Sequence, residues 1–284
     1  MEQTRTIIGV DLGGTNMRAG LVEGDKIMEV SSCLVPKTDV AKEVTQALIT
    51  TIRKVLTPEV EGIGVGVPSL VKAASGVVYD VQNIPSWKKI PLKDILENEF
   101  NVPVYINNDA NCFAVGERVY GAGQDYDDFV GLITGTGLGG GIIKKGHLLQ
   151  DQNCGAGEFG MMPYLEHDYE YYCSGQFFEN VHHINGGELA QRAAAGDKEA
   201  LVIFREYGTH LGKAIKAILF AVDPNAIVLG GSVSKSYEYY NEAMWKEIAT
   251  FPYQFVLENF VIVPSVVKEI AILGAAALYI DAAE

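Results

Sequence analysis

The feature that most constrains the fold of this chain is a unit that occurs twice, in which two short apolar strands flank a turn rich in glycine and threonine. The first unit has a strand over 6–11, a turn over 12–15 and a second strand over 17–22. The second has a strand over 129–134 and the glycine-rich turn 135–141, after which an apolar strand follows. Sequence identity between the two units is low, so they predict a structural echo and not a proven repeat.

Strands and helices alternate along the rest of the chain. Residues 40–56 place apolar side chains at helical spacing, and Pro58 stops that helix. Asp197 can cap a long helix that ends before Pro224, and a strand over 226–229 follows. This alternation predicts an α/β protein with two lobes. The expected N-terminal lobe is 1–115, completed by the C-terminal helix 270–284, and the expected C-terminal lobe is 116–269.

The charge of the chain narrows the choice of partners. The 284 residues carry a formal net charge of −14, and 48% of them are hydrophobic, as in an ordinary globular protein. Such an acidic surface repels nucleic acid and anionic lipid, so we expect neither as a partner. An anionic nucleotide would need backbone amides and Mg²⁺ in order to bind.

The cysteines and the apolar runs indicate where the protein works. Cys33, Cys112, Cys154 and Cys173 show no paired spacing, and no CxxC motif occurs. The chain begins without a basic segment followed by a long apolar stretch, and no apolar run reaches the roughly 20 residues that span a bilayer. We therefore expect reduced thiols and a cytoplasmic location.

The two glycine and threonine turns favour phosphate binding. Glycine lets backbone N–H groups approach oxygen atoms closely, and Thr15 or Thr136 can add a hydroxyl donor. Neither turn fits the GxxxxGK[ST] pattern, and the segment after the second is not the helix of a dinucleotide fold. Each turn alone is weak evidence for phosphate binding and is more typical of a plain hairpin. Together with Asp11 at the end of the first strand, they favour a nucleotide held between the lobes.

A run of amide and carboxyl side chains, residues 107–111, lies between an expected strand and a helix-like segment. One interpretation is a helix N-cap, a position that Asn and Asp favour. The other is a general base. A carboxylate at the end of a strand, flanked by amides that hold hydroxyl groups, suits the removal of a proton from an alcohol during phosphoryl transfer. Asp109 is the candidate.

Six segments occur in order along the chain: 11–15 (DLGGT), 83–87 (NIPSW), 108–111 (NDAN), 135–141 (GTGLGGG), 155–160 (GAGEFG) and 227–231 (IVLGG). In this order they are far more specific than any one of them alone. The series resembles the ROK (repressor, open reading frame, kinase) family of sugar kinases. The resemblance covers nearly the whole chain, from about Ile7 to Leu278.

The resemblance implies an actin-like, ribonuclease H-like ATPase fold, in which two lobes with mixed sheets flanked by helices close over a sugar and ATP. It implies Asp109 as the catalytic base and Asp11 as a ligand of Mg²⁺ through water. The implied sugar contacts are Asn83, Asn108, Asp109, Glu158 and Glu170. The implied nucleotide contacts are Asp11, Gly13, Gly14 and Thr15 in the first turn, Gly135, Thr136 and Gly137 in the second, and Gly230 and Gly231 at the nucleoside.

The chain departs from the family pattern at three places. Met161 stands where the family usually has a histidine, and Ser69 where it often has glycine. The usual zinc loop, CxCGxxGC, is replaced by 163–169, which leads into a cluster of tyrosines that can bury aromatic area instead. We therefore predict no structural zinc. Cys173 with His182 and His183 lacks a fourth ligand at a regular spacing.

The sequence thus predicts an ATP-dependent kinase that phosphorylates a hydroxyl of a free hexose, with glucose as the first choice. N-acetylglucosamine, N-acetylmannosamine, mannose and fructose remain open as substrates, as does a phosphoryl donor other than ATP. Two other classes are a sugar-responsive transcriptional regulator, which would need an N-terminal DNA-binding segment, and a non-catalytic sugar sensor. The resemblance also implies a homodimer.

Overall fold

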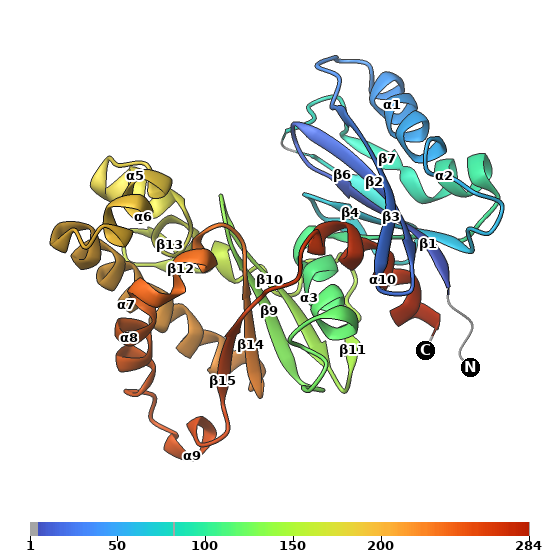
Figure 1. Ribbon diagram of the computed structural model, residues 1–284. Helices are drawn as coiled ribbons and strands as arrows, with labels where there is room; N and C mark the ends of the chain where they lie inside the picture. The colour runs from blue at the N-terminus through green and yellow to red at the C-terminus, as the bar shows by residue number, and fades with distance from the viewer. Residues whose placement is uncertain (1–4, 82, 284) are drawn as a thin grey trace.

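The computed structural model describes residues 5–81 and 83–283. Figure 1 shows two lobes, one at the upper right that contains the N-terminal strands and one at the lower left that contains most of the helices. The C-terminal helix α10 (Ile270–Ala283) lies with the N-terminal lobe, beside β1 (Thr6–Leu12). No helix in the described part of the chain is long and apolar enough to cross a membrane.

The sheet of the N-terminal lobe has the strand order β3-β2-β1-β4-β8. The first three strands are antiparallel neighbours, and β4 and β8 run parallel to β1. Pro58 follows α1 closely, as the sequence indicated. The further elements of the sheet and its helices are β2 (Asn16–Glu23), β3 (Lys26–Leu34), α1 (Ala41–Arg53), β4 (Gly62–Val67), α2 (Leu92–Phe100) and β8 (Val104–Asn108).

The two faces of this sheet are covered by different helices because apolar side chains and glycines alternate along its central strands. Ile8 and Val65 pack into a core with side chains of α1. On the other face, a Cβ atom at Gly9 would lie 2.0 Å from the carbonyl oxygen of Ile272, and one at Gly64 would lie 1.7 Å from that of Ala275. Glycine is therefore required for the backbone of α10 to rest directly on β1 and β4.

The sheet of the C-terminal lobe repeats this topology, with the order β11-β10-β9-β14-β15. Again the first three strands are antiparallel, and the last two are parallel to the central strand β9. The echo predicted from the sequence is thus a repeated topology, and the fold is the expected two-lobed actin-like, ribonuclease H-like one. The strands are β9 (Phe129–Thr134), β10 (Leu138–Lys144), β11 (His147–Leu148), β14 (Ala226–Gly230) and β15 (Val261–Pro264).

The helices of this lobe are organised around α7 (Lys198–Val222). Asp197 caps it, as predicted, by accepting hydrogen bonds from the amides of Glu199 and Ala200. The buried face of α7 packs against α8 (Tyr237–Ile248) and joins the largest core. The remaining elements are β12 (Pro163–Tyr164), β13 (His167–Asp168), α4 (Tyr169–Cys173), α5 (Gln176–His182), α6 (Gly186–Ala194), α9 (Gln254–Leu257) and two 3₁₀ turns, Phe159–Met161 and Val233–Ser236.

One helix belongs to both lobes. α3 (Asp109–Tyr120) follows β8 directly, packs against α10 and also covers β9 and β10 of the second sheet. The lobe boundary that we predicted after residue 115 falls inside this helix. The division of the chain at that residue remains a prediction, and α3 is the element that connects the two sheets.

Three expectations about elements need correction. The turn that we expected over 135–141 is confined to 135–137, because residues 138–141 belong to β10. The glycines there are needed for packing: a Cβ atom at Gly141 would lie 2.6 Å from the carbonyl oxygen of Ala110 in α3. The sequence predicts a helix over 91–100 with Pro91 in its first turn, but α2 begins at Leu92 and Pro91 is its N-cap residue. The small sheet of β5 (Val71–Lys72), β6 (Val77–Tyr79) and β7 (Lys89–Pro91) was not expected.

Candidate active site

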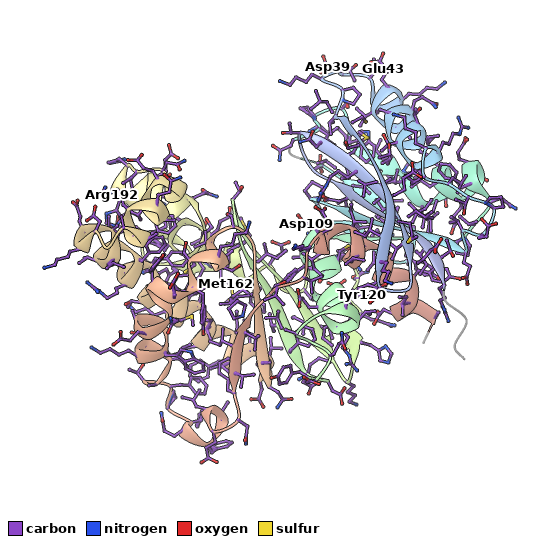
Figure 2. The ribbon with its side chains drawn as sticks, viewed as in Figure 1. Asp39, Glu43, Asp109, Tyr120, Met162 and Arg192 are labelled. Carbon is purple, nitrogen blue, oxygen red and sulfur yellow. The ribbon has the colours of Figure 1, made fainter. Side chains whose placement is uncertain are left out.

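Asp109 lies where β8 ends and α3 begins, between the lobes, as Figure 2 shows. The N-cap of α3 is its neighbour Asn108, whose side-chain oxygen accepts a hydrogen bond of 2.8 Å from the amide of Ala110. Oδ1 of Asp109 accepts from the same amide at 2.9 Å. The side-chain oxygen of Asn107 accepts from the amide of Asn108 and from the side chain of Asn111, both at 2.8 Å. The capping function therefore belongs to Asn108, and the segment is held by its own amides.

The electrostatics of Asp109 differ from those of an ordinary surface carboxyl. The residue is exposed to the cleft. The protein around it nevertheless removes enough hydration to raise its pKa to about 6, and the negative charges of Asp11 and Glu158 act in the same direction. The pKa of Glu158 is itself raised, by loss of hydration and by the charge of Glu170. Asp109 is thus an accessible carboxyl whose pKa is close to neutral, as suits a general base.

Asp109 shares a cavity of about 690 Å³ with six other residues predicted to bind the sugar or the phosphates. This volume lies in the usual range for a small-molecule site. The cavity also has an apolar rim of Leu70 and Met161, both largely exposed. Predicted site residues that line it are Asn108, Asp109, Gly135, Thr136, Gly137, Glu158 and Glu170.

The second turn, 135–137, is fixed by Glu170 of α4. One carboxylate oxygen of Glu170 accepts a hydrogen bond of 3.0 Å from the amide of Leu138. A Cβ atom at Gly137 would lie only 2.5 Å from that oxygen, so a side chain there would displace the carboxylate of Glu170. The side chain of Gln176 donates to the carbonyl oxygen of Thr136 and to Glu170, both at 3.1 Å. Sequence reasoning missed Gln176, because nothing in the sequence distinguishes it.

A second cavity, of about 450 Å³, lies on the other side of the same turn. Its walls include the apolar side chains of Phe178 and Phe204 and the polar side chains of Ser232 and Lys235, and it shares Gly135 and Thr136 with the cavity of Asp109. The turn therefore stands between an apolar pocket and the candidate base.

The glycines predicted at the nucleoside, Gly230 and Gly231, directly precede Ser232 but do not line this pocket. A Cβ atom at Gly230 would lie 2.5 Å from the ring of Phe113. Gly231 has a φ of +89°, and a Cβ there would lie 2.4 Å from the carbonyl oxygen of Thr134. Both glycines are thus explained by close packing, of Gly230 against α3 and of Gly231 against the end of β9.

The first turn belongs to the N-terminal lobe. The amide of Gly13 donates to the carbonyl oxygen of Asn16 at 2.9 Å. A Cβ atom at Gly14 would lie 2.3 Å from the Cβ atom of Asn83. Gly14, Thr15 and Asn83 line a cavity of about 810 Å³, and none of the described residues lines both this cavity and that of Asp109. The structure therefore places Asn83 at the first turn, away from Asn108 and Glu158.

Asp11 has a partner that sequence reasoning missed. Nη2 of Arg18 lies 2.8 Å from Oδ2 of Asp11, and Nη1 lies 2.6 Å from a carboxylate oxygen of Glu269. The signal was present in the sequence, because Arg18 is the one charged residue of the expected strand 17–22. Asp11 has two carboxylate oxygens. Among the described residues, side-chain donors bind Oδ2 and none binds Oδ1. The available oxygen of Asp11 suits a hydrated Mg²⁺, and the neighbouring amides of the turn suit phosphate oxygens.

The segment that replaces the family's zinc loop is held by aromatic side chains. Tyr164 stacks on Tyr169, with ring centroids 4.5 Å apart, and meets Tyr172 edge-on. Its hydroxyl shares a hydrogen bond of 2.9 Å with Nδ1 of His210 in α7. These four side chains, Tyr164, Tyr169, Tyr172 and His210, form the aromatic cluster. Glu170 directly follows Tyr169 in α4. The aromatic cluster therefore also holds in place the residue whose carboxylate fixes the second turn.

The other expectations about metals concern cysteines and histidines. Among residues 5–81 and 83–283, no group of three or more His, Cys, Asp or Glu side chains is placed to hold a metal ion. Cys173 is buried, and its carbonyl oxygen accepts a hydrogen bond from the hydroxyl of Tyr207. His182 instead lies 3.2 Å from Glu206.

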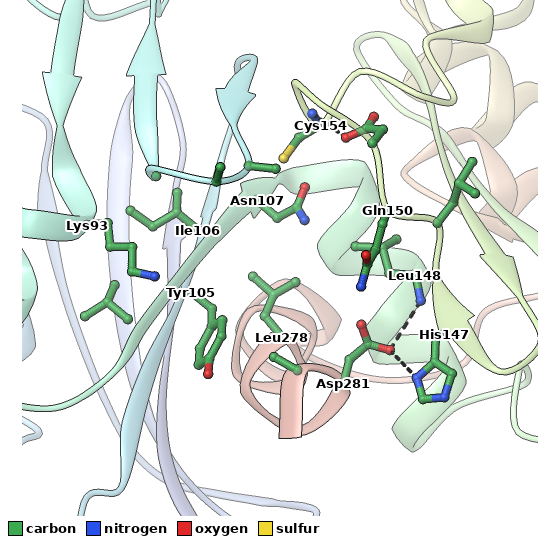
Figure 3. A pocket seen from close by; sticks show the side chains of 17 residues that line it. Lys93, Tyr105, Ile106, Asn107, His147, Leu148, Gln150, Cys154, Leu278 and Asp281 are labelled. Atoms are coloured by element: carbon green, nitrogen blue, oxygen red, sulfur yellow. Dashed lines mark hydrogen bonds and ion pairs between the residues drawn. The ribbon is translucent and has the colours of Figure 1, made fainter. Parts of the chain in front are cut away.

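A further cavity, of about 640 Å³, opens beside the outer edge of β8 (Figure 3). Figure 3 shows Lys93 and Tyr105 on one side of it and His147 and Asp281, whose Nδ1 and Oδ1 atoms lie 3.5 Å apart, on the other. None of the predicted site residues lines it. It is therefore distinct from the cavity of Asp109.

Two lobes of repeated topology, two glycine turns and a carboxylate between them define the class of actin-like phosphotransferases and sugar-binding relatives. The sequence pattern of the ROK family matches residues 7–282, and the chain belongs to this family. It is 28% identical to a glucokinase of Thermotoga maritima, over 96% of both chains. The structure of a ROK family glucokinase from Streptomyces griseus in complex with glucose and AMPPNP matches with a TM-score of 0.77 and 27% identity, over 96% of this chain and 98% of that one. The xylose repressor of Bacillus subtilis is 26% identical over 78% of this chain and 61% of its own length.

Proposed function

We propose that this protein is a kinase that transfers the γ-phosphoryl group of ATP to a hydroxyl of a free hexose, with glucose as the first candidate and a sugar 6-phosphate as the product. One observation carries the proposal: Gly135 and Thr136 line both the apolar pocket and the cavity of Asp109. A nucleoside in the first and a sugar in the second would have the phosphates between them. The glucose and AMPPNP named for the Streptomyces griseus relative support this choice of ligands.

In the proposed mechanism, the carboxylates of Glu158 and Glu170 accept hydrogen bonds from sugar hydroxyls, and the side-chain amide of Asn108 donates one. They hold one hydroxyl near Asp109, and this positioning lowers the entropic part of the barrier. Asp109 accepts the proton of that hydroxyl as its oxygen bonds to the phosphoryl group. Asn83 remains a proposed sugar contact from its place at the first turn.

Mg²⁺ and ATP fit the groups that are present. Asp11 would hold the metal through water, and the amides of the two turns would bind phosphate oxygens, with Thr15 and Thr136 as hydroxyl donors. When bound, Mg²⁺ neutralises charge on the transferred phosphoryl group. We also propose a homodimer.

The proposal is tested with an ADP-release assay over glucose, mannose, fructose, N-acetylglucosamine and N-acetylmannosamine. Release with one of these sugars, absent without sugar, is the expected result. The sugar preferred among the five would identify the substrate. Met161, at the rim of the cavity, replaces the histidine that is usual in the family and does not distinguish a hexose from an amino sugar. Sugar binding without ADP release from any of them would instead favour a sugar sensor. The Bacillus subtilis repressor in the family makes this outcome informative.

A further inference from the structure

The cavity of Asp109 presents a charge problem for a nucleotide. Asp80, Asp109, Glu158 and Glu170 line it, and none of the described residues that line it is Lys or Arg. The whole chain has a formal net charge of −14. Phosphate groups that approach the candidate base therefore meet carboxylates on several sides, and Mg²⁺ neutralises only part of the charge of a triphosphate. A cationic side chain close to the turns would remove much of this repulsion.

Arg18 is such a side chain. It faces Asp11 across the β1–β2 ladder and lies three residues after Thr15 of the first turn. Its Nε and Nη2 atoms both donate to Oδ2 of Asp11, at 3.2 and 2.8 Å. Its Nη1 atom donates to Glu269, the residue before α10. The Nε and Nη2 donors of the guanidinium group are thus occupied by Asp11, the residue that would hold the metal.

These partners are of a kind that a nucleotide can displace. The side chains of Arg18 and Asp11 are 33% and 26% exposed, and partly exposed ion pairs contribute little stability. A divalent cation at Asp11 would take the charge that now attracts Arg18. The planar fork of arginine donors matches phosphate oxygens as well as it matches a carboxylate. Exchange of one anion for another costs the guanidinium few hydrogen bonds.

We infer that Arg18 is a phosphate-binding residue of the nucleotide site, which turns from Asp11 to the phosphates when Mg²⁺ occupies Asp11. In the ligand-free protein Arg18 neutralises Asp11, and in the complex it neutralises the nucleotide. Glu269 keeps the guanidinium at the first turn in both states. The inference rests on the proposed function, but it concerns nucleotide binding and can be tested without phosphoryl transfer.

The test measures the dissociation constants of AMPPNP with Mg²⁺, of adenosine and of glucose by calorimetry. In Arg18→Gln we expect the dissociation constant of AMPPNP to rise about 10- to 100-fold, the size of a lost charge-assisted interaction. Adenosine and glucose should bind as in the unmodified protein, because neither has a phosphate. Arg18→Lys should recover part of the loss, since it restores the charge without the fork.

Arg192→Gln is the matched control. Arg192 also pairs with two carboxylates, Asp197 at 2.6 Å and Glu199 at 2.8 Å, but it lies on the far side of the C-terminal lobe (Figure 2). Its substitution should leave all three dissociation constants unchanged. Unchanged or tighter AMPPNP binding in Arg18→Gln would overturn the inference, and so would an equal loss for adenosine, which would indicate general damage. If the unmodified protein binds AMPPNP but phosphorylates none of the five sugars, the proposed function fails while the assignment of Arg18 is decided by binding alone.

Discussion

At the scale of single residues, Asp109 combines access to the cleft with a raised pKa. The sequence predicted its place, because it follows a strand and stands among amides. It did not predict which neighbour would cap α3, and the structure assigns that function to Asn108. Oδ1 of Asp109 accepts a hydrogen bond from the amide of Ala110, and the exposed side chain can still meet a substrate hydroxyl in the cavity.

Replacement of the candidate base separates binding from chemistry. Asp109→Asn keeps the shape of the side chain and removes its ability to accept a proton, so we expect turnover to fall by about 10²- to 10⁴-fold. The affinity for sugar should change little. The measurement is ADP release together with the dissociation constant of the preferred sugar. A variant that retains full turnover would exclude Asp109 as the base.

The pKa of about 6 at Asp109 gives the reaction a pH dependence. A base must be ionised, so kcat/KM should fall with decreasing pH below about 6, where Asp109 becomes protonated, and level off above it. Glu158→Gln removes one of the charges that raise this pKa, so the falling limb should move to lower pH. A kcat/KM that stays constant between pH 5 and 7 would contradict the assignment.

Other site residues were not predictable because tertiary contacts give them their function. Arg18 is part of no motif, and its importance comes from the pairing of β1 with β2 and from Glu269, which is 251 residues away in sequence. Gln176 acts through Thr136 and Glu170. Local sequence identifies a residue at the end of a strand, but not the distant side chain that it meets.

At the scale of elements, long segments with a clear period were predicted well and short ones were missed. The cap at Asp197 and the apolar stripe of α7 are local properties. The two-residue and three-residue strands β5, β6, β7, β12 and β13 are too short to show a period. The glycines of β10 misled the prediction of a long turn, because close packing against α3 also requires glycine.

The aromatic cluster connects the segment β12–α4 to α7 through ring contacts and one hydrogen bond. Burial lowers the pKa of His210, so its neutral ring can share the hydrogen bond with Tyr164. Tyr164→Phe removes this bond and should lower the free energy of unfolding by about 0.5–1.5 kcal/mol. Tyr164→Ala should cost more and also weaken sugar binding, because Glu170 loses its support. Urea unfolding and the sugar dissociation constant measure the two effects.

An exposed tyrosine provides the control for this prediction. Tyr253 is 54% exposed, and Tyr253→Phe should change the free energy of unfolding by less than about 0.5 kcal/mol. Treatment with a strong zinc chelator should leave the melting temperature of the unmodified protein unchanged. A large decrease would show that the segment depends on a metal after all.

At the scale of the whole molecule, the repeated topology places one glycine turn in each lobe. The first turn and Asn83 line one cavity, and the second turn and Asp109 line another. A phosphate chain can contact both turns only if the lobes approach each other. α3 is one connection between the two sheets, and the segment from β15 to α10 is the other. Near the end of α3, the buried carboxylate of Glu117 accepts a hydrogen bond from the hydroxyl of Ser265 in that segment. Movement is therefore expected at these two connections, as in hinged enzymes.

We expect sugar and nucleotide together to close the lobes, and small-angle scattering measures this as a decrease in the radius of gyration. Asp109→Asn with ATP and the preferred sugar is the best sample, because it binds both ligands but turns over slowly. Each ligand should also tighten the binding of the other by the same factor, since both favour the closed form. Adenosine is the control, because without phosphates it cannot join the two turns and should not add to closure. A radius of gyration that is equal with adenosine and with ATP would mean that the two turns do not act on one nucleotide.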